Sequence, residues 1–227
     1  MPINRQSFLP NYSIFRNPLK WSIFLALLVH VSGAIGIGFF NRQFFVGFTA
    51  LNLFLMFLLL LWNEAELNSK LLKAFLFAFF VGILTEIVGV NTGMLFGSYH
   101  YGSVFGEKIK GVPILIGLNW FCIVYASHQI ALSLSIKFKF NWVGTSLTTS
   151  TIATIFDWIM EPVALKLGFW HWQDNEIPIF NYMSWFGVSF LVALFFSWLG
   201  IKKTNRFALY LLLIQVVFFV FLNLFLS

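Results

Sequence analysis

Seven runs of about twenty mainly apolar residues, joined mostly by short polar links, fill most of this chain. A helix that crosses the hydrocarbon core of a bilayer needs about 20 such residues, so each run predicts one membrane-spanning helix. Only 10% of the residues are charged, far fewer than in soluble domains. We therefore expect an all-α polytopic membrane protein with one domain over residues 1–227 and helices near 20–40, 44–62, 71–90, 113–136, 143–165, 178–200 and 205–226.

The basic residues are distributed unevenly between the two sides of this predicted bundle. With the N-terminus inside, the inner segments hold ten of them: Arg5, Arg16, Lys20, Lys70, Lys73, Lys137, Lys139, Lys202, Lys203 and Arg206. The outer segments hold four: Arg42, Lys108, Lys110 and Lys166. Cytoplasmic loops are enriched in Lys and Arg, which predicts an inside N-terminus and an outside C-terminus in the inner (cytoplasmic) membrane. The net charge of +6 forms no basic stripe, so we expect no nucleic-acid partner.

Two long links, 91–112 and 166–177, fall on the predicted outer side. Both are rich in glycine and aromatic residues rather than charge, so we expect them to pack back over the bundle. The single cysteine, Cys122, lies in an apolar run, which excludes a disulfide framework and a cysteine zinc site.

The two halves of the chain around these links match each other. Glu86 precedes Gly97 by eleven residues, and Asp157 precedes Gly168 by eleven. Each glycine is followed by an aromatic–His–aromatic triplet and then by a helix that opens with Pro and carries Trp-Phe seven residues later. We therefore predict an internal repeat of two helical hairpins in which Glu86 and Asp157 are equivalent groups facing one cavity in the outer half of the bundle. The predicted copies are 80–136 and 151–200.

Asp157 and Glu161 stand one helical turn apart, so they project from one face of a predicted spanning helix. Ionisable residues inside membrane helices are costly and usually face a bundle interior or a water-filled cavity. Burial disfavours the charged form of a carboxyl group, and a carboxyl that keeps its proton near neutral pH is a general acid. A pair of carboxyls hydrogen-bonded to Trp or Asn to fix helix packing is the alternative.

Several other polar and aromatic residues are candidates for the same site. His100 and His171 could orient a carboxyl, shuttle protons or simply pack at the membrane interface. The four histidines form no cluster of the metal-binding kind, so we expect no metal. The tryptophans could line a cavity that stabilises positive charge, or form an interfacial aromatic belt.

Together these motifs resemble the CruF-type carotenoid hydratases, integral membrane enzymes of carotenoid biosynthesis. The resemblance covers about residues 80–190 and rests on Glu86 with GVNTGMLFGSYHYG, Val112-Pro113 with Trp120, Asp157 with Glu161-Pro162, Trp170 with Trp172, and Pro178 with Asn181 and Trp185. Three positions depart from the family pattern: Glu161 replaces Asp, Ile177 replaces Val and Ser184 replaces Gly.

The resemblance implies a hydro-lyase, a carotenoid 1,2-hydratase, that adds water to the terminal ψ-end double bond of lycopene, γ-carotene or a similar polyene. Protonation would give a tertiary cation that water captures, without any cofactor. Other enzymes of carotenoid biosynthesis are the implied partners. The candidate catalytic residues are Asp157, Glu86, Glu161, His100 and His171. The candidate substrate-binding residues are Tyr99, Tyr101, Trp120, Trp158, Trp170, Trp172, Trp185, Asn91 and Asn181.

Other functions fit parts of the same inventory. A proton-initiated carotenoid cyclase needs the same acid and aromatic side chains but excludes water. A non-catalytic carotenoid-binding protein needs the cavity alone. A prenyltransferase would need a second acidic motif, which is missing after Glu86, and a retinal photoreceptor would need a lysine in the last helix, which has none from Phe207 to Ser227.

Overall fold

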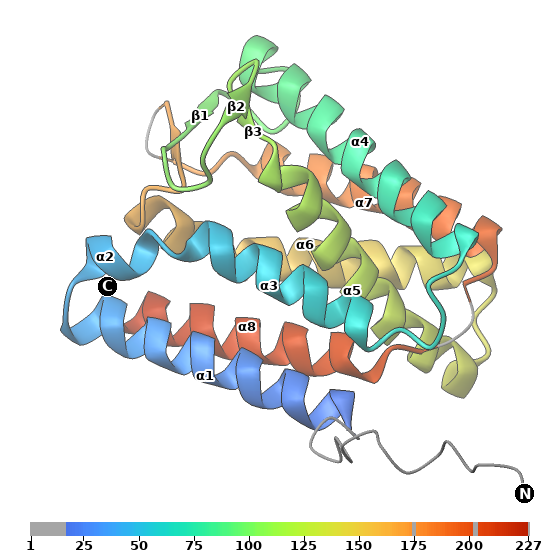
Figure 1. The fold of residues 1–227 in the computed structure, drawn as a ribbon. Helices are drawn as coiled ribbons and strands as arrows, with labels where there is room; N and C mark the ends of the chain where they lie inside the picture. Colours follow the sequence, from blue (N-terminus) through green and yellow to red (C-terminus); the bar gives the residue numbers. More distant parts are fainter. Residues whose placement is uncertain (1–16, 174–175, 202–203, 227) are drawn as a thin grey trace, which may run out of the picture.

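The computed structural model describes residues 17–173, 176–201 and 204–226 as a bundle of long helices (Figure 1). The helices are α1 (Pro18–Phe39), α2 (Arg42–Val46), α3 (Thr49–Trp62), α4 (Ser69–Thr92), α5 (Leu115–Phe138), α6 (Trp142–Lys166), α7 (Ile179–Leu199) and α8 (Arg206–Phe225). The predicted all-α bundle is confirmed, and each predicted span starts and ends within two residues of the observed helices. The span predicted at 44–62 is interrupted at Gly47, which separates α2 from α3. Of the basic residues predicted inside, Arg5, Arg16, Lys202 and Lys203 lie outside the described residues.

Asparagine begins five of these helices. The side-chain oxygens of Asn17, Asn41, Asn68, Asn141 and Asn205 accept hydrogen bonds from backbone N–H groups in the first turns of α1, α2, α4, α6 and α8. The first N–H groups of a helix have no partner inside it, and such a cap stabilises the helix by about 1 kcal/mol. The caps explain why helix starts in so apolar a chain coincide with its short polar links.

In the described part of the chain, six helices are long and apolar enough to cross a bilayer, as expected of an integral membrane protein. The seventh long helix, α6, is not among them, because its buried face carries hydroxyl groups. Ser146 Oγ lies 3.1 Å from Ser197 Oγ of α7. The other hydroxyls donate to backbone carbonyls of α6 or of its N-cap residue, Asn141. The buried hydroxyl residues are Thr145, Ser146, Thr149 and Ser150. The hydroxyl-bearing face of α6 is therefore turned toward the other helices, while residues such as Trp158 on its other face are exposed.

The long links fold back over the bundle, as the sequence predicted, and they do so through strands that it did not. Strand β1 (Tyr99–Tyr101) pairs antiparallel with β4 (Trp170–Trp172), and His100 stands opposite His171. Within the first link, β2 (Lys108–Ile109) pairs with β3 (Val112–Pro113). We call β1 and β4 the aromatic ribbon. Because side chains alternate along a strand, its tyrosines and tryptophans are buried while both histidines are exposed.

The helices α4 and α5 approach closely under the ribbon because α4 carries a glycine there. A Cβ atom built on Gly82 would collide with the ring of Trp120, which is fully buried on α5. Glycine at this position therefore makes the space that the indole occupies.

We predict that Gly82→Ala destabilises the protein, although alanine favours a helix more than glycine does. The added methyl group overpacks the contact with Trp120, which costs about 1–3 kcal/mol. Thermal unfolding in detergent should show a lower midpoint. Gly187→Ala is the matched control, because a Cβ on this glycine of α7 meets nothing within 4 Å. An unchanged midpoint for Gly82→Ala would contradict the close packing described here.

Candidate active site

Three carboxyl groups meet beneath the aromatic ribbon. Glu86 comes from α4, and Asp157 and Glu161 come from α6; their exposed fractions are 4%, 0% and 2%. The three side chains line one small cavity of about 20 Å³. A space of about 10–15 Å³ on this measure holds one water molecule, so the cavity is large enough for one.

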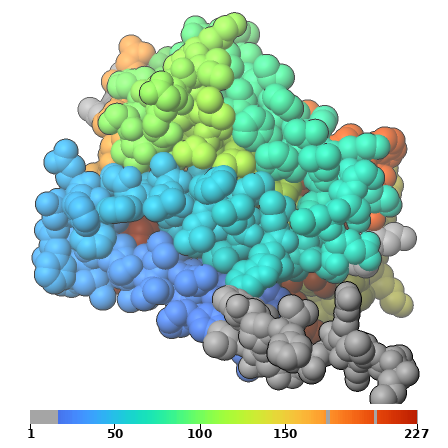
Figure 2. All heavy atoms as spheres, in the orientation of Figure 1, coloured from blue at the N-terminus to red at the C-terminus, as the bar shows by residue number. Residues whose placement is uncertain are grey.

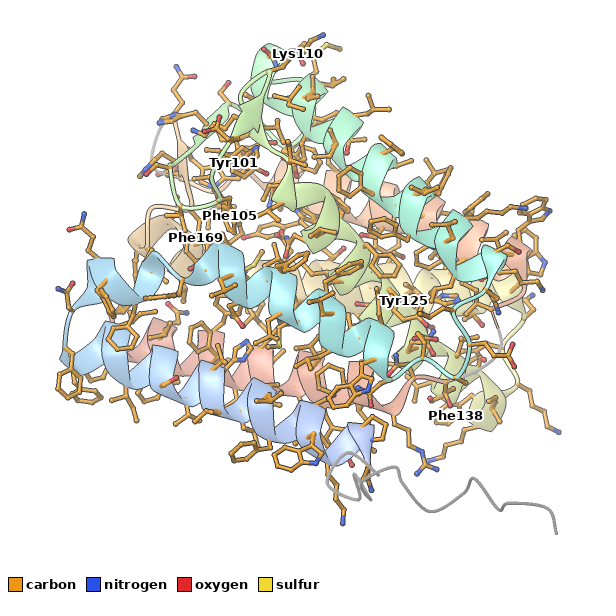
Figure 3. The ribbon with its side chains drawn as sticks, viewed as in Figure 1. Tyr101, Phe105, Lys110, Tyr125, Phe138 and Phe169 are labelled. Atoms are coloured by element: carbon orange, nitrogen blue, oxygen red, sulfur yellow. The ribbon has the colours of Figure 1, made fainter. Side chains whose placement is uncertain are left out.

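Glu86 is surrounded by donors. Tyr99 donates its hydroxyl to Oε2, Tyr101 donates to the same oxygen at 2.7 Å, and the Trp120 indole donates to Oε1 at 3.0 Å. In Figure 3, Tyr101 lies in the ribbon region beside α4. Burial, and then the negative charge of Glu86, raise the pKa of both tyrosines, so both hydroxyls keep their protons and remain donors. Three donors favour the charged form of Glu86.

Glu161 has a matching set of partners from the other strand. The indoles of Trp170 and Trp172 donate to Oε2 at 3.0 and 3.2 Å, and the Asn181 amide donates to Oε1 at 3.2 Å. Each glutamate thus takes two donors from one ribbon strand and one from the helix that follows it. The hydrogen bonds also fix the direction in which the buried face of the ribbon points.

By its hydrogen-bond partners, Glu86 corresponds to Glu161. By its distance along the chain from the following glycine and strand, Glu86 corresponds to Asp157. The physical reason is how far each helix continues toward its ribbon strand. Six residues lie between the end of α4 at Thr92 and Tyr99, but only three lie between the end of α6 at Lys166 and Trp170. Because α6 continues closer to its strand, Glu161, one turn after Asp157, lies about as far from the end of its helix as Glu86 does in α4.

Asp157 differs from both glutamates. Its Oδ2 accepts one hydrogen bond, from the Asn181 amide at 3.0 Å, so this amide bridges Asp157 and Glu161. Its Oδ1 is buried and accepts no hydrogen bond from any described residue. Of the six carboxyl oxygens in the cluster, Oδ1 alone is without a donor there. A proton on this oxygen would be free to leave toward a bound molecule.

Aromatic rings form the remaining walls. Trp120 and Trp185 stack with ring centroids 3.9 Å apart and planes inclined by 12°. Phe96 has a φ of +67°, a left-handed conformation that costs a non-glycine residue about 1–3 kcal/mol. This backbone conformation positions the fully buried Phe96 ring at the cavity wall, with its centroid 6.2 Å from that of Trp120. Such ring faces attract positive charge.

Four of the candidate residues lie away from the carboxyls. His100 and His171 are on the outward face of the ribbon, where their ring centroids are 5.2 Å apart. Trp158 is 62% exposed on the outer surface of α6. Asn91 donates to the carbonyls of Ile87 and Lys110 and so ties α4 to the β2–β3 hairpin. The geometry gives these four side chains no contact with the cavity.

The cavity also has lining residues that were not among the candidates. Asn119 precedes Trp120 on α5, Ile116 lies one turn earlier on the same helix, and Phe96 belongs to the glycine-rich motif after Glu86. Phe96 had a sequence signal in its place in that motif, and Asn119 had one as a polar side chain in an apolar helix that could hold water or a carboxyl. Within the described ranges, no group of three His, Cys, Asp or Glu side chains has the arrangement of a metal site.

Comparison with known proteins places the chain in a family. Residues 44–227 match the profile of a family described as carotenoid biosynthesis protein. A relative named bisanhydrobacterioruberin hydratase, from Haloarcula japonica, is 28% identical over 104 residues, which are 44% of this chain and 36% of the relative's length. The match therefore spans about a third of that protein, and no solved structure matches. The resemblance recognised from the motifs is confirmed at the level of the family: the chain belongs to the carotenoid biosynthesis proteins.

Proposed function

We propose that this protein is a carotenoid hydratase that adds water to the terminal ψ-end double bond of a linear or monocyclic carotene. The observation that carries the proposal is the fully buried Asp157, whose Oδ1 is the one carboxyl oxygen in the cluster that has no donor among the described residues. The similarity to a named hydratase supports the same class of reaction. The product would have a 1-hydroxy-1,2-dihydro end.

Hydration of a trisubstituted double bond starts with a proton. In the proposed mechanism, the Asp157 Oδ1–H bond breaks and the π electrons form a new C–H bond at the less substituted carbon. The positive charge is left on the tertiary carbon, where the faces of the Trp185 and Phe96 rings stabilise it. Burial disfavours the charged form of Asp157, which has a single donor, so Asp157 is the natural acid of the cluster.

The second step consumes water. A water molecule in the carboxyl cavity forms the new C–O bond, and its extra proton passes to a carboxylate. Glu161 is suited to accept it, because its three donors favour the charged form and because Asn181 joins it to Asp157. Transfer of that proton to Asp157 restores the acid. The sum is substrate plus one water, with no oxidation or reduction, so the residues described are sufficient for the proposed reaction.

We predict that expression in a host that accumulates lycopene or γ-carotene yields a carotenoid heavier by one water for each end that reacts. Mass spectrometry of the extracted pigments measures this directly. In deuterated water the product should also carry one deuterium on the carbon next to the new alcohol. A product with the mass of the substrate would instead identify a cyclase, and an unchanged pigment with folded protein would identify a binding protein.

We predict that Asp157→Asn lowers conversion by about 100-fold or more, as expected when a general acid is lost. The amide has nearly the same shape and can still bond to Asn181, so the variant should insert and fold. Glu107→Gln, the same change at an exposed carboxyl between β1 and β2, is the control and should convert normally. The proposed acid is wrong if Asp157→Asn converts at the rate of the unaltered protein.

The orientation is part of the proposal and rests on the basic residues of the links. The exposed His171 on the ribbon should then face outward, and the exposed Lys137 at the end of α5 should face the cytoplasm. We predict that His171→Cys in intact cells reacts with a membrane-impermeant maleimide, whereas Lys137→Cys reacts only after the membrane is opened. The native Cys122 is buried and should give a low background. The reverse pattern would invert the orientation.

A further inference from the structure

The carboxyl cavity is too small for the end of a polyene, but a second chamber adjoins it. This inner chamber, of about 80 Å³, shares the side chains of Asn119 and Trp170 with the carboxyl cavity. Its walls come from α1, α3, α5, α6 and α8 and from the links, and phenylalanine is the commonest residue in them. Phe105 and Phe169 pack edge to face in this wall, and Figure 3 places both just below Tyr101. The inner chamber therefore approaches the carboxyls from the apolar side.

A larger opening continues from the inner chamber to the surface of the bundle. It lies between α1 on one side and α2 and α3 on the other, has a volume of about 240 Å³, and we call it the window. The window and the inner chamber share five lining residues: His30, Ile37, Thr49, Asn52 and Phe218. Leu51, at the rim, is 61% exposed. Figure 2 shows the surface hollowed between α1 and α2–α3, with atoms of the C-terminal helix visible behind.

On the basis of the proposed function, we propose that this window is the lateral entrance through which the end of the carotene passes from the bilayer to Asp157. The substrate class suits the route, because a polyene dissolves in the hydrocarbon core and the exposed rim is mainly apolar, with Phe48 and Leu51 beside Ser32. The order of the spaces suits it too: the window adjoins the inner chamber, and the inner chamber adjoins the carboxyl cavity. The reacting end would reach the acid while the rest of the chain stays among mainly apolar side chains, with His30, Thr49 and Asn52 as the polar residues at the junction of the two spaces.

His30 and Phe218 separate the window from another opening. That opening is a groove of about 400 Å³ between α1 and α8, and both residues line it as well. His30 Nδ1 donates to the Ala26 carbonyl at 2.8 Å, and its ring meets Phe218 edge to face with centroids 5.4 Å apart. The groove shares only these two residues with the inner chamber, against five for the window, so the window is the more continuous route.

The outer wall of the window comes from α1, which lies outside the segment that matches the family profile. The acid, the ribbon and the inner wall on α3 all lie within the matched segment. We therefore place the control of substrate entry on a helix that is separate from the chemistry. A change on α1 should slow access without altering the carboxyl cluster.

The test fills the window with a side chain. Gly33 lines it, and a Cβ there makes only an ordinary contact, 3.6 Å from Phe218, so Gly33→Leu should fold and occupy the opening. Leu51→Trp blocks it independently from the α3 side. The matched controls are Gly187→Leu on α7 and Leu58→Trp on α3, where 44% of Leu58 is exposed and neither residue lines the window.

Two measurements separate entry from chemistry: association of lycopene with the purified protein, followed by tryptophan quenching, and formation of the hydrated product. We expect both blocking variants to slow association by about tenfold, with both controls unchanged. Binding without hydration by the unaltered protein would reject the proposed function alone, since association still tests the window. A further variant, Val217→Trp, fills the groove between α1 and α8 instead. The proposed window would be overturned by normal association in both blocking variants or by a loss of association confined to Val217→Trp. It would also be overturned if the unaltered protein bound no lycopene.

Discussion

The burial of three carboxyl groups inside an apolar bundle is the constraint on which the rest of the structure depends. An unpaired buried charge costs several kcal/mol, so a buried carboxylate persists only where donors face it. In the described structure those donors are neutral side chains: two tyrosine hydroxyls, three indoles and one amide. Four of the six donors lie on the aromatic ribbon. The links between helices therefore have to fold back over the bundle, and their aromatic composition follows from that requirement.

Much of the fold could be predicted because its signals are local. Apolar runs fix the helices, and asparagine caps fix several of their starts to within two residues. The break at Gly47 and the pairing of β1 with β4 were not predictable in this way. The paired strands are about seventy residues apart in the chain and only three residues long, so no local sequence pattern predicts their pairing. The hydroxyl residues near the start of α6 mark the face of that helix that packs against other helices, which length and hydropathy alone did not convey.

The candidate site was predictable in its chemistry and less so in its geometry. Acids and aromatic residues were found because they are conspicuous in an apolar chain, but the side on which each one projects depends on helical phase and strand alternation. Trp158 follows Asp157 directly, and one helical step turns it away to the outer surface. His100 lies between two site tyrosines, and the alternation of a strand turns it outward. Neighbours in the chain are thus poor guides to neighbours in the site.

The two glutamates have matching sets of donors, and the residue four positions before each one differs. Before Glu161 that residue is Asp157; before Glu86 it is Gly82, where the Trp120 ring fills the space. Glycine at position 82 has two consequences. The Trp120 indole can reach Glu86, and Asp157 is the one carboxyl of the described cluster with a single hydrogen-bond donor. A carboxyl at both positions would crowd four of them around a cavity with room for one water. In the proposed mechanism this asymmetry leaves the acid on α6 alone, while the aromatic wall draws on both predicted copies, with Phe96 from the first and Trp185 from the second.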